Sequence, residues 1–258
     1  MRLLLRIHTL LVLVFLYLPI AVIVVLSFNQ SRFGVQWRGF TTAWYEKLFH
    51  NPRIALYAEN TLVVALVSTL IATVLGTLLA LGLYRYRFRG KGLLRFLLYV
   101  PVVIPDIVMG VALLLFFAWI REATGFFRLS LLTIILGHVT YQLAYVALVV
   151  RSRLASLDPA LEEAAADLGA GGFATFRYVT FPLIWPGVLA GALLAFSLSL
   201  DDFVITFFTA GPGSTTLPLY IFGSVKRGVT PEIHALSSIL IAASMAGVLL
   251  GRALLRRR

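Results

Sequence analysis

Residues 158–172 read DPALEEAAADLGAGG, an acidic, alanine-rich stretch in a chain that is otherwise mostly apolar. Asp158 suits an N-cap, Pro159 suits the first helical position, and Gly169 suits a left-handed C-cap. Leucine and alanine recur at steps of four, three and four residues, at positions 157, 161, 164 and 168. Three carboxylates fall largely off this apolar face: Glu162, Glu163 and Asp167. The stretch therefore predicts a short helix with one apolar face.

The composition around this stretch is that of a membrane protein. Of 258 residues, 60% are hydrophobic and 13% are charged, and the mean hydropathy is +0.95. Soluble domains carry roughly a quarter charged residues. The net charge of +11 could suggest nucleic acid as a partner. However, the basic residues lie in short loops between apolar runs. In membrane proteins this pattern sets the orientation of the chain, so we expect no nucleic-acid partner.

About 20 apolar residues are needed for each crossing of a bilayer. The apolar runs predict an all-α integral membrane protein of one domain, 1–258, with six transmembrane helices. The expected spans are 8–28, 59–84, 94–120, 130–150, 183–208 and 234–252. The first run exceeds the apolar region of a signal peptide and no cleavage site follows it, so we expect it to remain as a span.

Lysine and arginine set the predicted orientation. With the N-terminus inside, cytoplasmic segments hold 14 of the 22 basic residues and outer segments hold the other 8. The bias is clearest in the loop RYRFRGKG and in the tail RRR. Both termini are therefore predicted to be cytoplasmic, and so is the loop 152–182 between the fourth and fifth spans.

Residues 29–58 form a long outer connection that carries Trp37, Trp44 and Tyr45. Such aromatic residues are typical of a helix at the lipid headgroups. Alternatively, Trp37 forms part of a lip that guides a cationic ligand by cation–π contact.

Apart from Glu59, the first residue of the second span, three of the eleven acidic residues fall within the apolar spans: Asp106, Asp201 and Asp202. An aspartate at the centre of a membrane helix costs about 2.5–3.5 kcal/mol, so such residues usually face a cavity, a partner or a pathway. The third and fifth spans are expected to run in the same direction, which places the three carboxylates at comparable depth. Pro101 and Pro105 should also loosen the third span, as in helices broken beside a transport cavity.

Two further readings of this region stay open. Adjacent helical residues point about 100° apart, so only one of Asp201 and Asp202 is expected to face a pathway, and the pair could instead cap a helix end. In the fourth span, Tyr141, His138 and Gln142 could line the same cavity. Hydrogen bonding between helices is the commoner role of such residues.

The cytoplasmic loop carries a longer signature. Glu163-Ala164-Ala165 is followed after three residues by Gly169, and after nine more by Val179-Thr180-Phe181-Pro182. This resembles the motif E-A-A-x3-G-x9-I-x-L-P of the membrane subunits of binding-protein-dependent ABC importers, with valine for isoleucine and phenylalanine for leucine. In that family the loop forms coupling helices that insert into a cleft of the ATP-hydrolysing subunit. Without a partner, the same loop would be a solvated amphipathic hairpin.

The segments PDIVMG, AAADLGA, FSLSLDDFV and GSVKRGVTPEIHALSSI are similar to those of spermidine/putrescine permeases of the PotC type. The resemblance implies a type I ABC importer (MetI-like) permease fold in the bacterial cytoplasmic membrane. It also implies four partners besides lipid: an ABC ATPase dimer, a second homologous permease, an extracytoplasmic polyamine-binding receptor and the polyamine itself. The residues it favours for coupling are Glu162, Glu163, Ala164, Ala165, Asp167, Gly169 and Pro182.

The chain contains no G-x4-G-K-[ST] phosphate loop, so we expect it not to be an enzyme and to bind no cofactor. ATP and Mg would bind to the partner ATPase. Within importers, the alternative substrates are an iron complex, a sulfate-like anion or a phosphonate, although three intramembrane acids favour a cation. A remote alternative is an intramembrane aspartyl protease, but SLDDF and IPDIV lack the expected Gly-x-Gly-Asp context.

Overall fold

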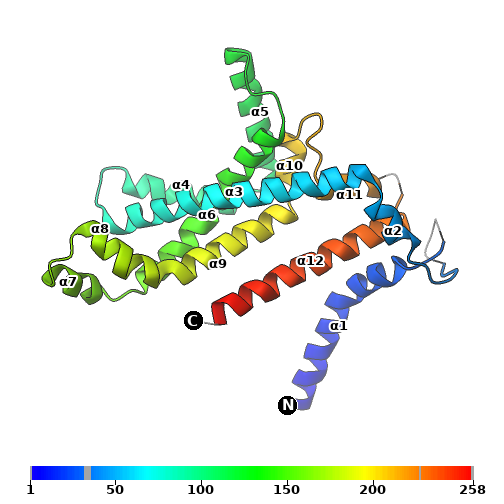
Figure 1. Cartoon of the computed structure of the whole chain (residues 1–258), viewed down its shortest axis with the longest axis horizontal. Coiled ribbons are helices and arrows are strands. Elements are labelled where there is room, and N and C mark those ends of the chain that lie inside the picture. The colour runs from blue at the N-terminus through cyan, green and yellow to red at the C-terminus, as the bar shows by residue number, and fades with distance from the viewer. Residues whose placement is uncertain (1, 32–35, 227, 257–258) are drawn as a thin grey trace.

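The computed structural model describes residues 2–31, 36–226 and 228–256, and this part of the chain is helical apart from its loops and one isolated bridge between Asn29 and Phe40. The elements are α1 (Arg2–Leu26), α2 (Ala43–Phe49), α3 (Pro52–Arg85), α4 (Lys91–Val103), α5 (Asp106–Thr124), α6 (Leu131–Ala155), α7 (Ala160–Asp167), α8 (Gly172–Thr175), a π-helical turn (Phe176–Thr180), α9 (Phe181–Leu200), α10 (Val204–Thr209), α11 (Leu217–Val225) and α12 (Pro231–Arg256). Figure 1 shows them as an elongated bundle.

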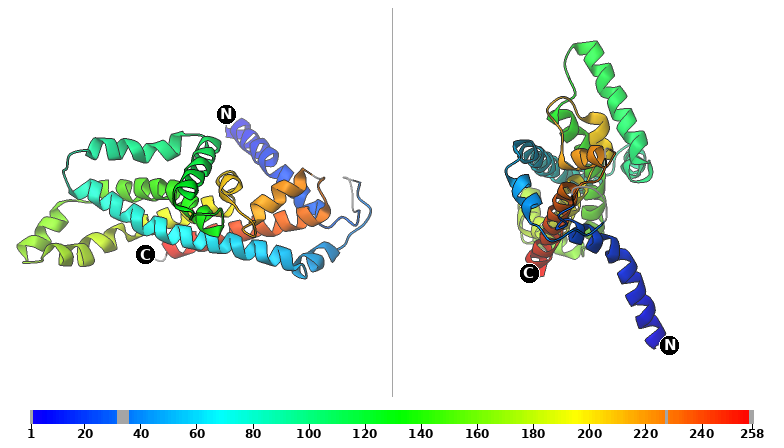
Figure 2. Two further views of the ribbon diagram at one scale, coloured as in Figure 1. Left: turned by 90° about the horizontal axis from the view of Figure 1, so that it is seen from above. Right: turned by 90° about the vertical axis from the view of Figure 1, so that its right-hand side faces the viewer.

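The centre of the bundle is made by α3, α6 and α9, which pack side by side (Figures 1 and 2). Small residues allow this close approach. A Cβ atom on Gly187 would lie 2.7 Å from Cβ of Arg153, and one on Gly76 would lie 2.9 Å from Cβ of Val146. The buried cluster between these helices consists of Ala80, Val146, Val150, Leu154, Ile184, Val188 and Ala195.

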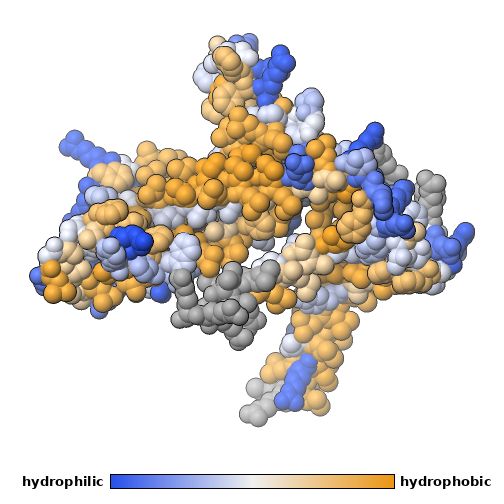
Figure 3. Space-filling model, viewed as in Figure 1, coloured by the Kyte–Doolittle hydropathy of each residue, from blue (hydrophilic) through white to orange (hydrophobic). Residues whose placement is uncertain are grey.

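Among the described residues, five helices are long and apolar enough to cross a membrane: Leu3–Leu26, Pro52–Arg85, Asp106–Thr124, Leu131–Ala155 and Gly172–Leu200. Figure 3 shows apolar surface over the long helices, including α1, with polar residues gathered toward the ends of the molecule. The sixth expected span, 234–252, falls within α12, which is not one of these five, so the count of six stays a prediction. Of the basic tail, Arg257 and Arg258 lie outside the described residues.

The expected span 94–120 is not one helix. Helix α4 ends at Val103, Ile104 and Pro105 are extended with ψ of 134° and 136°, and α5 begins at Asp106. Figure 2 shows that α4 and α5 run in different directions. The cause is Pro105, which has no N–H to donate and disfavours helical geometry in the residue before it. The expected loosening of this span is therefore a complete break.

The expected span 183–208 also differs from the structure. A continuous helical run, 172–200, passes through the π-helical turn into α9 and stops at Leu200, and α10 begins only at Val204. Pro182, the last residue of the signature, lies in the first turn of α9. Because proline cannot donate to the preceding turn and its ring crowds that turn, the widened π-helical geometry just before it is physically reasonable.

The described part of the segment between α10 and α12 folds back against the bundle through α11. Leu217 packs in a cluster with Leu48, Ile54, Ala235 and Leu236. The side chain of Asn60 donates to the carbonyl groups of Gly213 and Thr215, at 3.1 and 2.9 Å. These contacts satisfy polar groups of an irregular segment, as a low-dielectric environment requires.

Candidate functional site

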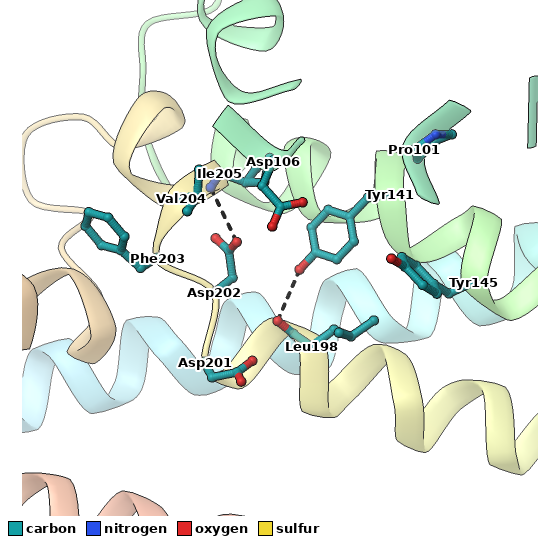
Figure 4. A pocket seen from close by; sticks show the side chains of 10 residues that line it. All are labelled: Pro101, Asp106, Tyr141, Tyr145, Leu198, Asp201, Asp202, Phe203, Val204 and Ile205. Carbon is teal, nitrogen blue, oxygen red and sulfur yellow. Dashed lines mark hydrogen bonds between the residues drawn. The ribbon is translucent and has the colours of Figure 1, made fainter. Parts of the chain in front are cut away.

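The breaks in the third and fifth expected spans meet at one cavity of about 310 Å³ (Figure 4). It is lined by Pro101, Asp106, Tyr141, Tyr145, Leu198, Asp201, Asp202, Phe203, Val204 and Ile205. Four of the residues singled out from the sequence, the three aspartates and Tyr141, are thus brought together here. Helix breaks expose backbone polar groups, and within a membrane such groups are tolerated beside a cavity.

Asp202 is held in place by hydrogen bonds. Its Oδ2 atom accepts from the backbone N–H of Thr206 at 2.8 Å, from the Thr206 hydroxyl at 2.9 Å and from Nε2 of His138 at 3.1 Å. Its Oδ1 atom accepts from the backbone N–H of Ile205 at 3.3 Å. The side chain is only 10% exposed. Asp202 therefore caps the N-terminus of α10, which is the capping alternative considered from the sequence.

Asp201 and Asp106 differ from Asp202 because both are exposed in this chain. Within the described residues, neither carboxylate forms a hydrogen bond or ion pair with the side chain of another residue. Asp201 follows the C-terminus of α9, where the helix dipole is negative, so carboxylate and dipole both attract a cation. Asp106 lies in the first turn of α5. The free carboxylates of the cavity are these two.

Aromatic rings complete the cavity. The Tyr141 hydroxyl donates to the carbonyl of Leu198 at 3.3 Å, which leaves the ring as part of the wall (Figure 4). Phe203 stacks on Phe222 of α11 with the ring centroids 3.9 Å apart. Carboxylates beside aromatic faces can hold an organic cation through charge attraction and cation–π contact. Among the described residues no basic side chain lines this cavity.

The polar residues of α6 mainly join helices together. His138 and Gln142 are buried. The amide of Gln142 donates to the carbonyl of Ala195 at 3.1 Å, and Nδ1 of His138 lies 2.7 Å from the hydroxyl of Ser199. These contacts agree with the commoner role of such residues, which is hydrogen bonding between helices. Sequence reasoning missed Tyr145 and Phe203 as lining residues because no charge or spacing marks them.

Trp37 does not belong to this cavity. Its side chain is 52% exposed in the outer connection before α2, and it is not among the lining residues. The nearby Trp44 instead supports the fold, since its indole N–H donates to the carbonyl of Asn29 at 2.9 Å. A guiding role for Trp37 stays a prediction.

The segment 158–170 has the capped helix expected from the sequence. Oδ1 of Asp158 accepts from the N–H of Ala160 at 3.0 Å, at the start of α7. At the other end Gly169 has a φ of +82°. The N–H of Ala170 donates to the carbonyl of Ala165, and that of Gly169 donates to the carbonyl of Ala166, at 3.0 and 2.9 Å. This pair of bonds is a Schellman motif and explains why glycine occupies position 169.

Glu162 ties α7 to the bundle. Its carboxylate pairs with the Arg85 guanidinium at the end of α3, at 2.8 Å, and accepts from the hydroxyl of Thr180 just before α9. Partial burial raises the pKa of this carboxyl, but the bonds from Thr180 and Arg85 and the charge of Arg85 outweigh burial and lower the pKa below its ordinary value. The sequence offered no signal for this pairing, since Arg85 was read only for orientation.

The rest of the signature lies on the surface of this knuckle, here defined as residues 158–182. Glu163, Ala164, Asp167, Gly169 and Pro182 are exposed, and Ala165 is half-buried. Large apolar side chains accompany them: Leu168 is 89% exposed, and Phe173 and Tyr178 are also largely exposed. Exposed apolar groups beside carboxylates are typical of a protein interface. The described residues contain no group of three or more acidic or histidine side chains that could hold a metal ion.

Comparison with known proteins identifies the family of the chain. Residues 72–257 match the family model described as binding-protein-dependent transport system inner membrane component. The chain is 43% identical over 242 residues to the spermidine/putrescine transport system permease protein PotC of Escherichia coli K12, covering 94% of this chain and 90% of that protein. It is 44% identical over 231 residues to the putrescine transport system permease protein PotI of the same strain, covering 89% and 82%.

Among solved structures, a bacterial ABC transporter involved in import of the acidic polysaccharide alginate contains a similar chain. The TM-score is 0.79 at 19% identity, and the match covers 98% of this chain and 94% of that one. At this identity the likeness shows the fold alone, which is that of a type I ABC importer permease.

Proposed function

The chain belongs to the family of binding-protein-dependent transport system inner membrane components, and from this membership we propose that it carries polyamines such as spermidine or putrescine through the cytoplasmic membrane. It is a permease subunit, and ATP hydrolysis in such importers is performed by a separate ATPase. The names of its relatives support a polyamine as the substrate. The observation that carries the proposal is the cavity with two free carboxylates, Asp106 and Asp201, beside aromatic rings.

The chemistry of the cavity supports an organic cation over the alternatives. A sulfate-like anion or a phosphonate would need basic side chains, and the lining residues include none. The N-termini of α5 and α10 reach the cavity, but each already has a carboxylate beside it, Asp106 and Asp202, and the C-terminal end of α9 also disfavours an anion. A protonated polyamine loses hydration when it enters the membrane, and carboxylates with aromatic faces replace part of it. Binding there has to stay weak enough for release.

The proposed assembly contains this chain, a second homologous permease, an ATPase dimer that binds ATP and Mg, and an extracytoplasmic polyamine-binding receptor. Both termini and the knuckle are placed on the cytoplasmic side, in keeping with the distribution of Lys and Arg. ATP binding would bring the two ATPase subunits together and move the knuckle, so that the cavity opens toward the receptor. Hydrolysis would then return the cavity toward the cytosol.

The test is transport by the four-component complex in proteoliposomes, with receptor loaded with spermidine, putrescine or sulfate as an anion control. Polyamine should be taken up and should stimulate ATP hydrolysis, while this chain alone should hydrolyse none. Asp201→Asn and Asp106→Asn should each reduce uptake by roughly tenfold or more, because a hydrogen bond to a charged group contributes about 1.5–3 kcal/mol.

Glu122→Gln serves as the matched control, since this exposed carboxylate lies in the last turn of α5 and does not line the cavity. Complex recovery should be unchanged in all three variants. Full uptake in both aspartate variants would sink the role of these carboxylates. Uptake of the anion in place of the polyamine would sink the substrate class.

A further inference from the structure

A buried polar cluster lies behind the cavity at the break between α9 and α10. Its centre is His138 of α6, which is 1% exposed. Nδ1 of the ring lies 2.7 Å from the hydroxyl of Ser199, and Nε2 lies 3.1 Å from Oδ2 of Asp202 and 3.0 Å from the hydroxyl of Thr206. One side chain on α6 therefore contacts the last turn of α9, a residue within the break and the first turn of α10.

The donors in this cluster can be assigned from its chemistry. The Thr206 hydroxyl gives its single proton to Asp202, so it faces Nε2 only as an acceptor, as does the carboxylate itself. Nε2 must therefore carry hydrogen. Nδ1 can then accept from the Ser199 hydroxyl, which satisfies both ring nitrogens without a charge on the ring. The histidine is thus a directional donor to Asp202.

This donor completes the shell of Asp202. With His138, four N–H or O–H groups point at its two oxygens, which is about the capacity of a carboxylate. Three of the four come from α10 itself, and within the part of the chain that the structure describes His138 is the only donor from another helix. Because the carboxylate is saturated, little of it remains for a ligand, whereas the neighbouring Asp201 has no such shell.

We propose that His138 is a positioning residue: it holds Asp202 against the N-terminus of α10, keeps the fifth span broken at residues 201–203, and so leaves Asp201 as the carboxylate of the pair that faces the cavity. Without the bond to α6, Asp202 would keep only its donors from α10, and the backbone that carries Asp201 would lose one of the contacts that fix its orientation. The consequence for transport rests on the proposed function, while the structural part does not.

Three substitutions separate the two bonds of the ring. In His138→Gln the side-chain amide reaches the place of Nε2 and can still donate to Asp202. In His138→Asn the amide reaches only the place of Nδ1, near Ser199, and His138→Leu removes both bonds. In the reconstituted complex we expect His138→Gln to keep at least half of the polyamine uptake, and the other two variants to lose fivefold or more at equal amounts of assembled complex.

A second measurement uses no polyamine. Thermal midpoints of the purified full chain are compared for His138→Leu, Asp202→Asn, Asp201→Asn and the two double variants that contain His138→Leu. The His138 and Asp202 substitutions should each lower the midpoint by several degrees and should be clearly non-additive, since they remove one shared bond. The His138 and Asp201 substitutions should add.

The outcomes distinguish this proposal from the proposed function. Rescue by asparagine but not by glutamine, or additive midpoints for His138 and Asp202, would overturn the positioning role even if polyamines are transported. If the wild-type complex takes up no polyamine but the thermal midpoints of the His138 and Asp202 variants are non-additive, the proposed substrate is wrong and the positioning role of His138 stands.

Discussion

Glu162 and Glu163 are neighbours with opposite surroundings. Glu162 is turned inward, where it pairs with Arg85 and accepts from Thr180, so it joins α7 to the ends of α3 and α9. Glu163 is exposed, and within the described residues its carboxylate has no ion pair. Glu162 thus fixes the knuckle to its own chain, whereas Glu163 keeps an exposed carboxylate that a partner protein can contact.

The inward pair predicts a pH dependence of stability. The pKa of Glu162 is lowered by folding, so its contribution is present at neutral pH and is lost as pH falls through the lowered pKa. Glu162→Gln keeps the shape and removes the charge. At pH 7 the full chain in detergent should lose about 0.5–1 kcal/mol, the range of a partly exposed ion pair. As pH falls below the lowered pKa of this carboxyl, where the group is protonated in the folded chain as well, wild type and variant should converge.

The measurement is the thermal midpoint of both proteins across this pH range. Glu163→Gln is the matched control, because it removes the adjacent charge without touching Arg85, and its midpoint should follow wild type throughout. A constant gap between wild type and Glu162→Gln at every pH would contradict the assignment of the effect to charge.

The sequence predicts some of the residues that line the cavity but not their individual roles. The cost of an intramembrane carboxylate marks Asp106, Asp201 and Asp202 without any structure, and all three line one cavity. The difference between Asp201 and Asp202 could not be foreseen, because it depends on where the helix stops and on His138 from another helix. Thr206, four residues after Asp202, is the one local hint, since its N–H and hydroxyl both bind the carboxylate.

The knuckle and the cavity, the two candidate sites of this chain, are both formed at helix ends. The knuckle depends on the Schellman motif after α7, and the cavity depends on the breaks at Pro105 and at residues 201–203. The cap and the loosened third span follow from local rules, since glycine and proline have conformational effects of their own. The break after Leu200 has no such residue, and the sequence there reads as continuous apolar helix. At that break Asp202 bonds to Nε2 of His138 on α6, a contact between helices that local sequence rules do not predict.

Gly169 allows the cap of α7 to be tested by itself. A Cβ atom at this position would meet no atom within 4 Å, so the effect of Gly169→Ala comes only from its φ of +82°. The left-handed conformation costs a non-glycine residue about 1–2 kcal/mol. Hydrogen exchange at the amides of residues 168–170 should therefore become about fivefold faster or more, because that energy corresponds to such a factor.

Two variants control this experiment. Gly171→Ala lies in the same loop with open space around it but an ordinary φ of −68°, so its exchange should not accelerate. Gly169→Asn should fall between glycine and alanine, because asparagine tolerates the left-handed region. Equal acceleration by Gly169→Ala and Gly171→Ala would show that loop flexibility, and not the Schellman cap, is what glycine provides.

Several helices expose apolar surface that no other part of the described chain covers. In the apolar window of α1 no residue is buried, and the helix leans away from the bundle (Figures 1 and 2). Exposed leucine, valine and phenylalanine side chains also cover α4 and α5. A helix that is apolar all round needs lipid or another protein around it. The membrane and the proposed second permease would supply that surrounding, whereas the knuckle lies at one end of the long axis, away from α1.

The exposed position of Glu163 on the knuckle predicts that reversing its charge weakens binding of the ATPase. If the exposed carboxylate of Glu163 meets basic residues on the ATPase, Glu163→Lys places like charges opposite one another, which costs several kcal/mol in an interface. The ATPase that co-purifies with the tagged permease should fall roughly tenfold or more, while the permease itself is recovered normally. Raising the salt concentration should weaken this repulsion and restore part of the binding, because exposed charges are screened.

Glu122→Lys is the control for the same charge reversal at a site far along the chain from the knuckle, at the end of α5, and should retain the ATPase. Glu163→Gln should give an intermediate loss, since it removes an attraction without adding a repulsion. Unchanged co-purification with Glu163→Lys would mean that the exposed carboxylate does not meet the ATPase. Leu168, Phe173 and Tyr178 would then have to supply the contact through apolar burial, and binding would show little dependence on salt.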